Sequence, residues 1–349
     1  MIEKLRAIGV SSTAWFESYL LNRKQCVEVD TIFSEPLSIS CGVPQGSILG
    51  PQLFLIYIND MNISINCKLS LYADDSALLY SHRDATVIGD FLTQELSTCK
   101  QWLVDNKLSL HIGKTECILF GTNKRLKGCD FRVTCDGKAI ERVFSVKYLG
   151  VQLDACLNGS AHIHNVLKTC AARMAFLYRN SNLLSFSCRL TLCSALVQPY
   201  IDYCSSSWYS SLSVALQKKL DVLQRKMVRF VLGMDFRQHV SLSELRSLKW
   251  LSIPDRVSYF KILHLFKVRN NLAPSYLKVN FRPISEAHSY NTRGRHFNYH
   301  VSKDEAMCPS SFSFTAIKLW NSMPSELKNV QQLPVLKRKL KEYLFRRYV

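Results

Sequence analysis

Two adjacent aspartates, Asp74 and Asp75, are the residues of this chain whose type and spacing are best suited to chemistry. They lie between two short apolar runs, 69–72 and 76–80, a pattern that predicts a β-hairpin with the acids at its bend. Neighbouring carboxylates repel each other and cannot pack inward, so a purely structural turn would be better served by Asn-Gly or Asp-Gly. A divalent cation removes this conflict. Carboxylate oxygens suit Mg²⁺, which completes its shell with water and substrate phosphates.

A rigid loop is predicted upstream, over residues 42–51, because three glycines and two prolines occur there in ten residues. Backbone can approach a ligand closely at glycine, and the side chain of Gln45 can hydrogen-bond the edge of a base or a sugar. A strand-to-helix connector is an equally good interpretation of this segment alone. The apolar run 53–58 and the aspartate pair that follow it favour the binding interpretation.

The order and spacing of these motifs resemble those of one family, the reverse transcriptases of non-LTR, LINE-type retrotransposons, especially the jockey-like and CR1-like groups. Residues 42–51 resemble its template- and nucleotide-contacting motif, and residues 72–75 resemble its metal-binding catalytic motif. Residues 114–121 are similar to its next, lysine-bearing motif, and residues 146–151 to its primer grip. Residues 316–324 are similar to the tail of the same elements, so the resemblance covers nearly the whole chain.

The resemblance implies RNA-directed DNA synthesis, in which two Mg²⁺ ions align the primer hydroxyl with an incoming deoxynucleotide on an RNA template. It makes Asp74 the principal metal ligand with Asp75 beside it, and it brings Lys114 to the leaving pyrophosphate. Taken alone, Lys114 is explained almost as well as a solvated lysine before a strand. The implied nucleotide- and template-binding residues are Gly42, Pro44, Gln45, Gly46, Tyr72 and Ala73. The implied primer-grip residues are Tyr148, Leu149 and Gly150.

One part of the family pattern has no counterpart in this sequence. The family carries a further catalytic aspartate on a strand well before the glycine-proline loop, whereas Asp30 is the only aspartate of residues 1–41. Asp30 falls in a hairpin region that the family keeps after that strand, so it is a poor substitute. We therefore expect an incomplete metal site and no polymerase activity from this chain alone, as in a 5′-truncated element copy or a partial gene model.

The elements that must position these motifs are mixed helices and strands. The sequence predicts one helix over residues 1–22, two strands over 25–33 and 36–41 with a turn at 34–36, and a helix from Pro51 to about Asn59. A helix over 87–106 between apolar strands predicts a βαβ-like unit that ends with a strand over 115–120. A last strand is predicted over 144–153.

From residue 154 onward the pattern is mainly helical, and a turn-rich stretch over 280–310 precedes a terminal helix. The predicted fold class is α+β. It comprises a partial palm over residues 1–153 with an antiparallel sheet and packed helices, a helical thumb-like domain over 154–280, and a basic C-terminal region over 281–349. The palm and thumb names follow from the resemblance.

The charge of the chain is concentrated in its second part. The 349 residues carry a net charge of +18, yet residues 1–153 hold 16 basic and 16 acidic residues. The whole excess lies after residue 153, which predicts a zone that holds phosphates. The clearest helix there, residues 216–232 ending at Gly233, has a polycationic face. That face consists of Lys218, Lys219, Arg225, Lys226 and Arg229.

Other binding roles remain open for this face, which is also typical of a solvated helix or of a helix on a membrane surface. The charge of the second part favours nucleic acid. The terminal helix repeats the pattern, with Lys337, Arg338, Lys339, Lys341, Arg346 and Arg347.

Composition places the chain among folded intracellular proteins, nuclear or cytoplasmic. It is 47% hydrophobic, and its odd number of cysteines, 13, without CxxC spacing argues against a disulfide framework. Its longest nearly apolar run, residues 48–58, is too short to span a bilayer. The expected partners are RNA template, DNA primer and deoxynucleotides. The alternatives are a noncatalytic nucleic-acid-binding protein that kept the fold and, less favoured, another palm polymerase such as an intron maturase.

Overall fold

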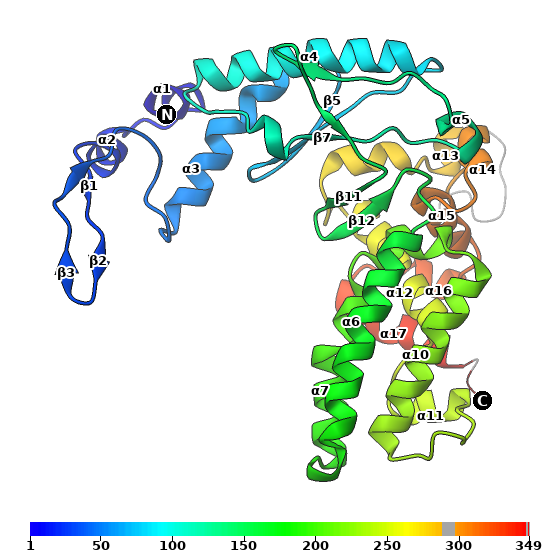
Figure 1. Cartoon of the computed structure of the whole chain (residues 1–349). Helices are drawn as coiled ribbons and strands as arrows, with labels where there is room; N and C mark the ends of the chain where they lie inside the picture. Colours follow the sequence, from blue (N-terminus) through cyan, green and yellow to red (C-terminus); the bar gives the residue numbers. More distant parts are fainter. Residues whose placement is uncertain (288–296, 347, 349) are drawn as a thin grey trace. The chain divides into compact units, whose positions relative to one another are not determined.

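The computed structural model describes residues 1–287, 297–346 and 348, and the chain forms two compact units (Figure 1). The first unit comprises Met1–Leu119 and Asn123–Val143, and the second comprises Phe120–Thr122 and Phe144–Val349. Helices and small sheets are mixed, as the α+β class requires. Within the described residues the strands form six two-stranded ladders. A larger antiparallel sheet was predicted, but most strands are only two residues long and leave few backbone groups for a third partner.

The first unit begins with two short helices, α1 (Ile2–Ala7) and α2 (Ala14–Leu20), where the sequence predicts one. The chain leaves the first helix at Gly9, whose φ of 91° is incompatible with a right-handed helix. Lys4 fastens α1 to the rest of the unit, since its ammonium donates to the Tyr57 carbonyl at 2.7 Å and pairs with Asp60 at 2.8 Å. It also lies over the ring of Trp102.

An exposed ribbon follows, made of β1 (Lys24–Gln25), β2 (Glu28–Val29), β3 (Ile32–Phe33) and β4 (Leu37–Ser38). Strand β1 pairs with β4 and β2 pairs with β3, both antiparallel. The ribbon reverses at Asp30 and Thr31, whose φ angles of 49° and 70° are left-handed. The predicted turn at residues 34–36 is therefore wrong, because the reversal occurs inside the run of β-branched residues that was assigned to one strand.

The centre of the first unit matches the prediction closely. Helix α3 (Leu49–Ile58) continues into the 3₁₀ helix η1 (Asn59–Ser64), and the predicted hairpin is present as β5 (Lys68–Tyr72) and β6 (Asp75–Leu79). Helix α4 (Ala85–Asp105) then packs against η1 and β6. Their shared core consists of Ile58, Met61, Ile65, Cys67, Cys99 and Trp102.

A buried carboxylate joins α4 to the start of the hairpin. Glu95 is only 2% exposed, and it accepts hydrogen bonds from the backbone N–H of Asn66 at 2.6 Å and of Cys67 at 3.2 Å. The Asn66 side-chain amide donates to the other oxygen at 3.1 Å. Hydrogen bonds to a charged acceptor are among the stronger ones in proteins, so this contact fixes where β5 begins.

The rest of the first unit packs on the other side of α4. The remaining elements are η2 (Ile112–Lys114), β7 (Glu116–Cys117), α5 (Asn123–Leu126), β8 (Thr134–Cys135), β9 (Lys138–Ala139) and β10 (Glu141–Arg142). Strand β7 pairs in parallel with β10 and not with β6, so the predicted βαβ-like unit is not formed. Gly89 allows the close approach, because a Cβ there would lie 2.4 Å from the carbonyl oxygen of Arg132.

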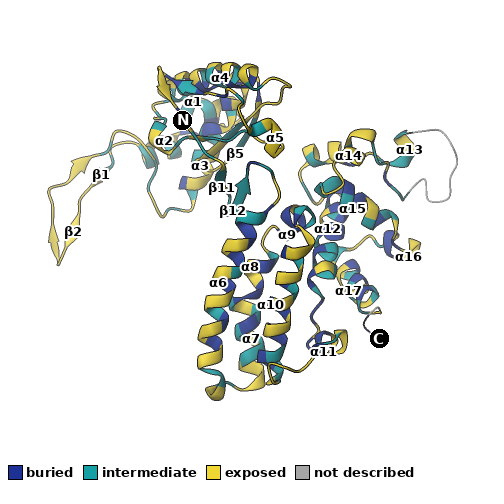
Figure 2. Ribbon diagram, turned by 45° about the vertical axis from the view of Figure 1, so that its right-hand side comes forward, coloured by how far each residue is buried: buried dark blue, intermediate teal, exposed yellow. Residues whose placement is uncertain are grey.

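The second unit opens with a hairpin where the sequence predicts a single strand, formed by β11 (Ser145–Tyr148) and β12 (Val151–Asp154). The next elements are α6 (Ser160–Arg179), η3 (Ser181–Leu183), α7 (Phe186–Leu196), α8 (Gln198–Asp202), α9 (Ser205–Trp208), η4 (Tyr209–Ser211) and α10 (Val214–Leu232). Helices α6, α7 and α10 bury their facing sides and expose the opposite ones (Figure 2). Because β12 packs on α6, the boundary between the units falls before residue 144 and not at 153.

Helix α12 (Ile253–Arg269) is the centre of the remaining chain. The other elements from residue 242 onward are α11 (Leu242–Ser247), η5 (Ser275–Asn280), α13 (Ile284–Ala287), α14 (Lys303–Met307), α15 (Phe312–Asn321), α16 (Ser325–Lys328) and α17 (Leu333–Phe345). Helices α15 and α17 both pack on α12, and their buried side chains join one core with α6 and α10. Residues on both sides of position 280 thus share a core. Part of the predicted turn-rich stretch, 288–296, lies outside the described residues.

Residues 316–324, the segment similar to the tail of the family's elements, contain two side chains that brace the fold, Trp320 and Asn321. Trp320 is fully buried, and its indole N–H donates to the carbonyl of Phe297 at 2.7 Å. Asn321 accepts from the N–H of Tyr299 at 3.0 Å and donates to its carbonyl at 2.8 Å. Both side chains therefore hold the segment at 297–299 against α15. No helix of the described chain is long and apolar enough to cross a membrane.

Lys261 on α12 is a buried cation without a carboxylate hydrogen-bond partner among the described residues. It is 1% exposed, and its ammonium donates to the hydroxyls of Ser210 and Thr315, each at 2.6 Å. Burial lowers the pKa of Lys261 from 10.5 to about 8. The lysine thus joins three elements, η4, α12 and α15, at the cost of placing a charge in an apolar core.

This arrangement predicts a pH-dependent stability. Folding lowers the pKa of Lys261, so the unfolded chain binds the proton more tightly, and the free energy of unfolding should rise between pH 8 and pH 10.5. The rise should reach roughly 3 kcal/mol relative to Lys261→Met, which has no proton to lose. Urea unfolding of both proteins at about pH 7 to pH 10 measures it. Buried Tyr209 and Tyr348 affect both proteins equally, and parallel pH curves would contradict the prediction.

Candidate functional site

The predicted aspartate pair lies at the exposed end of the β5–β6 hairpin. Tyr72 pairs with Asp75 in the ladder, so the turn itself consists of Ala73 and Asp74. Leu71 of β5 and other inward side chains of the hairpin pack on the core below α4, while both carboxylates are exposed. The hairpin prediction is therefore confirmed, with Asp75 as the first residue of β6 and not part of the turn.

The turn holds an alanine in a strained conformation. Ala73 has a φ of 51°, the left-handed region that favours glycine, whereas Asp74 is not in that region. Glycine, asparagine or aspartate normally occupies a position of positive φ in a two-residue hairpin turn. The left-handed conformation costs an alanine about 1 kcal/mol. The register of the hairpin imposes this cost, and it aims the next residue, Asp74, away from the core.

Neither carboxylate is engaged by the described part of the chain. Among the described residues, Asp74 and Asp75 form no ion pair and no side-chain hydrogen bond, and Tyr72 beside them is 65% exposed. No group of three or more His, Cys, Asp or Glu side chains suited to a metal occurs within those residues either. The hairpin thus offers two oxygen-donating side chains to a cation, and any further ligands must come from elsewhere.

The glycine-proline loop has an accessible backbone. Gly42 and Gly46 have φ angles of 81° and 79°, and a Cβ at either would meet no atom within 4 Å. Ser47 closes the loop, since its hydroxyl donates to the Pro44 carbonyl at 2.8 Å and accepts from the Gly50 N–H at 2.9 Å. The loop ends at the start of α3 (Figure 1).

The side chain of Gln45 in this loop is exposed, and Pro44 is half-buried. In the described structure no side-chain hydrogen bond or ion pair joins the loop to Asp74 or Asp75. The loop and the hairpin belong to the same unit.

Lys114 lies shortly before a strand, so its position agrees with the interpretation as a solvated lysine. It is the last residue of η2, two positions before β7, and its side chain is exposed. Among the described residues it has no ion-pair partner. Lys114 is thus a free cation of the first unit.

The segment that resembles a primer grip is the turn of the β11–β12 hairpin, in the second unit. Tyr148 pairs with Val151, and the two turn residues Leu149 and Gly150 both have left-handed φ angles, 45° and 81°. Tyr203 supports the turn, since its hydroxyl donates to the Leu149 carbonyl at 2.6 Å. Its ring lies so near Gly150 that a Cβ there would be 3.0 Å from the ring.

The predicted cationic face of α10 is present with one exception. Lys218, Lys219, Arg225 and Lys226 are exposed, while Leu220 and other apolar residues of the helix are buried. Arg229 is half-buried, and its Nε donates to the carbonyl of Gln238 at 2.9 Å. That guanidinium therefore anchors the loop after the helix and is a poorer candidate for contacting a ligand.

The terminal helix α17 also presents exposed cations, namely Lys337, Arg338, Lys339 and Arg346. Lys341 is half-buried, and its pKa is lowered first by burial and then by nearby Arg256 and Lys249. Arg347 lies outside the described residues. The face that a polyanion would contact is therefore smaller than the run of basic residues suggests.

Two comparisons with known proteins bear on this geometry. Residues 1–153 match the family model described as "Reverse transcriptase (RNA-dependent DNA polymerase)". The chain is also 27% identical over 288 residues to an "RNA-directed DNA polymerase from mobile element jockey" of Drosophila melanogaster, covering 79% of this chain and 30% of that protein.

Two further relatives have similar names. The jockey polymerase of Drosophila funebris is 30% identical over 228 residues, covering 62% of this chain and 24% of that protein. A "Probable RNA-directed DNA polymerase from transposon X-element" of Drosophila melanogaster is 27% identical over 255 residues, covering 69% of this chain and 27% of that protein. The chain thus spans less than a third of the length of these relatives.

The Tyr203 contact predicts the effect of a substitution in the turn. Gly150→Ala should destabilise the second unit by roughly 1–3 kcal/mol, because the left-handed φ and the contact with the Tyr203 ring both oppose a Cβ. Gly137→Ala is a matched control, since Gly137 is also the second residue of a two-residue hairpin turn at φ 72° but has open space around it. Chemical unfolding measures both losses. An equal cost at the two glycines would contradict a specific role for Tyr203.

Proposed function

We propose that this chain is the part of a non-LTR retrotransposon polymerase that binds the catalytic metal and the primer-template, because residues 1–153 match the reverse transcriptase (RNA-dependent DNA polymerase) family model. The observation that carries the proposal is the exposed hairpin turn with two unengaged carboxylates, Asp74 and Asp75. RNA template, DNA primer and deoxynucleotides are the proposed partners. Thirteen cysteines without a disulfide agree with the proposed intracellular location.

The donor set of the hairpin fits a hard divalent cation such as Mg²⁺. Asp74 and Asp75 supply carboxylate oxygens, and the exposed turn leaves room for water and phosphate oxygens to fill the other coordination positions. When bound, the metal neutralises phosphate charge and lowers the pKa of the attacking hydroxyl. The residues of the chain that hold the metal must therefore stay fixed. The hydrogen bonds to Glu95 and the apolar packing of β5 and β6 fix the hairpin that carries them.

The other predicted residues have positioning roles in this proposal. Gln45 and the open backbone at Gly42 and Gly46 contact the template and the nucleotide, and Tyr72 covers one side of the nucleotide pocket. Lys114 supplies a positive charge or a proton to the leaving pyrophosphate. The β11–β12 turn holds the primer end, and α10 holds the backbone of the duplex as a thumb helix, with its exposed lysines on the phosphates.

Two protein carboxylates do not complete a two-metal site. Such a site clamps the attacking and leaving oxygens between two ions, which requires shared and separate ligands. Among the described residues, no group of three or more His, Cys, Asp or Glu side chains could hold a metal. We therefore propose that synthesis needs a further carboxylate from a polypeptide segment that the described structure does not contain.

Metal binding by the hairpin is directly testable. Mn²⁺ serves as a spectroscopic substitute for Mg²⁺, and electron paramagnetic resonance measures the free ion. Asp74→Asn and Asp75→Asn should each weaken Mn²⁺ binding by at least tenfold, because each removes one of two charged ligands. Asp90→Asn, an exposed acid on α4, is the matched control and should change nothing. Unchanged binding in both hairpin variants would refute a metal site here.

Catalytic competence is tested by primer extension on an RNA template with Mg²⁺. The chain alone should incorporate no deoxynucleotide, and adding a separately produced upstream segment of a jockey polymerase should restore synthesis that depends on Asp74. Synthesis by the chain alone, abolished in Asp74→Ala, would overturn the incomplete-site proposal. Nucleic-acid binding without restored synthesis would favour the alternative, a noncatalytic binding protein.

The proposed contacts of α10 predict a salt dependence. Replacing Lys218, Lys219 and Lys226 by Gln should weaken binding to an RNA-DNA duplex and reduce the slope of log affinity against log salt by up to about 3. Fluorescence anisotropy at several salt concentrations measures the slope. The control replaces three exposed lysines of the first unit, Lys124, Lys127 and Lys138, with the same change in net charge. Equal slopes in the two triple variants would mean that only net charge matters.

A further inference from the structure

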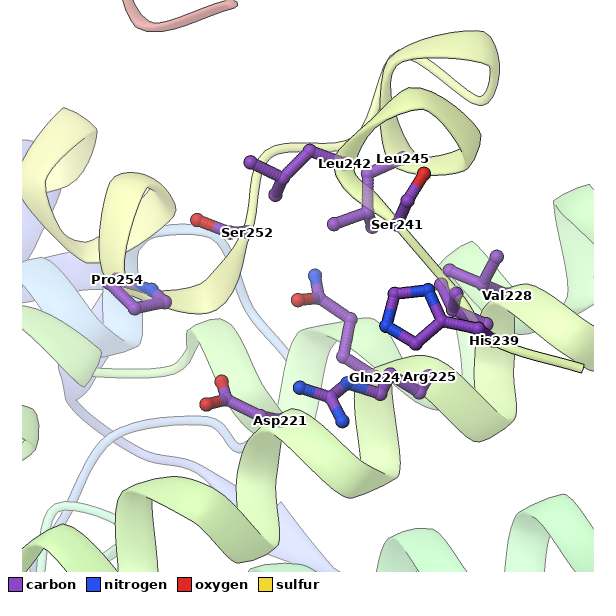
Figure 3. A pocket seen from close by; sticks show the side chains of 11 residues that line it. Asp221, Gln224, Arg225, Val228, His239, Ser241, Leu242, Leu245, Ser252 and Pro254 are labelled. Carbon is purple, nitrogen blue, oxygen red and sulfur yellow. The ribbon is translucent and has the colours of Figure 1, made fainter. Parts of the chain in front are cut away.

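A cavity of about 400 Å³ opens beside α10, along residues 221–228 of the helix (Figure 3). Its walls come from α10, from α11 and the segment that leads into it, and from the start of α12. Three kinds of side chain line it: apolar ones, hydrogen-bonded polar ones, and charged ones that form no hydrogen bond or ion pair with the described residues. The charged ones indicate what the cavity can bind.

The apolar part of the lining includes Leu242 and Pro254, which are exposed, and Val228, Val240 and Leu245, which are buried. Gln224 lies among them and is fully satisfied, because its amide donates to the Leu251 carbonyl at 2.9 Å and accepts from the Ile253 N–H at 3.2 Å. Gln224 therefore fixes the wall and is not available to a ligand. Such a surface suits the face of a planar, weakly hydrated group.

Asp221 and Arg225 also line the cavity, and they do not form an ion pair with each other. They are four residues apart on α10, a spacing at which Asp and Arg commonly pair, yet no ion pair within 4 Å forms between them. Among the described residues neither side chain has a hydrogen-bond partner. Figure 3 shows both projecting from the helix into the cavity, with the ring of His239 nearby.

The charged groups of the cavity determine which ligand it can bind. The Asp221 carboxylate accepts two parallel hydrogen bonds, and the Arg225 guanidinium donates two. Guanine offers adjacent donors at N1 and N2 and adjacent acceptors at O6 and N7 on one flat ring system. Adenine and cytosine place an amino donor where Arg225 needs an acceptor, and uracil has only one donor for Asp221.

We propose that this cavity binds an unpaired guanine base of an RNA strand, with Asp221 on the Watson–Crick edge and Arg225 on O6 and N7. The inference rests on the proposed function, in which α10 holds nucleic acid, and it adds base recognition to that role. It reassigns Arg225 from the phosphate backbone to a base edge, while Lys218, Lys219 and Lys226 remain phosphate contacts. Sequence-specific recognition of RNA commonly uses unstacked bases of this kind.

The test compares short single-stranded RNAs that differ at one base. Uridine decamers with one central guanosine, adenosine, inosine or 7-deazaguanosine are titrated at constant salt, with affinity measured by fluorescence anisotropy. The chain should prefer guanosine to adenosine by about tenfold or more. Inosine, which lacks the amino donor for Asp221, and 7-deazaguanosine, which lacks the N7 acceptor for Arg225, should each lose much of that preference.

Two variants assign the preference to the cavity. Asp221→Asn should abolish the difference between guanosine and inosine, and Arg225→Lys, which keeps the charge but loses the fork, should abolish the difference between guanosine and 7-deazaguanosine. Arg225 is exposed, so its replacement should not affect folding, and thermal unfolding verifies this for both. Asp90→Asn is the matched control for charge and should keep the full preference.

The possible failures are distinguishable. If the chain binds no RNA even at low salt, the proposed nucleic-acid face fails and the cavity proposal fails with it. If the chain binds every decamer equally, or if the folded variants keep the guanosine preference, the cavity proposal is wrong and the proposed function stands.

Discussion

The positions of the exposed acids Asp74 and Asp75 depend on the hydrogen bonds at the opposite end of their hairpin. Glu95 accepts the backbone N–H groups of Asn66 and Cys67, so helix α4 determines where strand β5 starts. With that start fixed and the inner face of the hairpin packed on α4, the ladder register leaves Ala73 and Asp74 as the turn. A slip of one residue would exchange the buried and exposed faces of both strands. A buried acid thus fixes the position of two exposed acids.

The two units differ in net charge, as the proposed function requires. The first unit, with 15 basic and 16 acidic residues, is nearly neutral, which is compatible with a carboxylate pair that attracts cations while phosphates approach. The second carries the excess of positive charge, but much of that charge is used for structure: Arg229 anchors a loop and Lys261 joins three elements in the core. Counting basic residues therefore overestimates the surface that can bind a polyanion.

Strong periodicity and local turn chemistry explain what the sequence predicted correctly. The hairpin around Asp74 and the helices α4 and α10 have clear apolar patterns, and Gly233 adopts the left-handed conformation expected at the end of α10. The predictions failed where a turn lacks its usual residues. The reversal at Asp30 and Thr31 lies within a β-branched run, and the turn at Leu149 and Gly150 has a leucine at positive φ.

Local sequence patterns could not predict the long-range contacts. Glu95 and Lys261 look like ordinary polar residues of amphipathic helices, and only their buried hydrogen bonds distinguish them. Tyr203 lies 54 residues from the carbonyl that it holds, so no local spacing could reveal it. The roles proposed for the site residues remain predictions, since they depend on ligands and not on the fold alone.

The brace formed by Trp320 and Asn321 has a consequence for shortened copies of such a chain. Helices α15 and α17 supply part of the core around α12, so a premature stop codon that removes them would expose the apolar side of α12, including Leu265 and Phe266. Exposed apolar surface of that kind promotes aggregation and degradation. Loss of the last few dozen residues would therefore destabilise the second unit and also remove the exposed cations of α17.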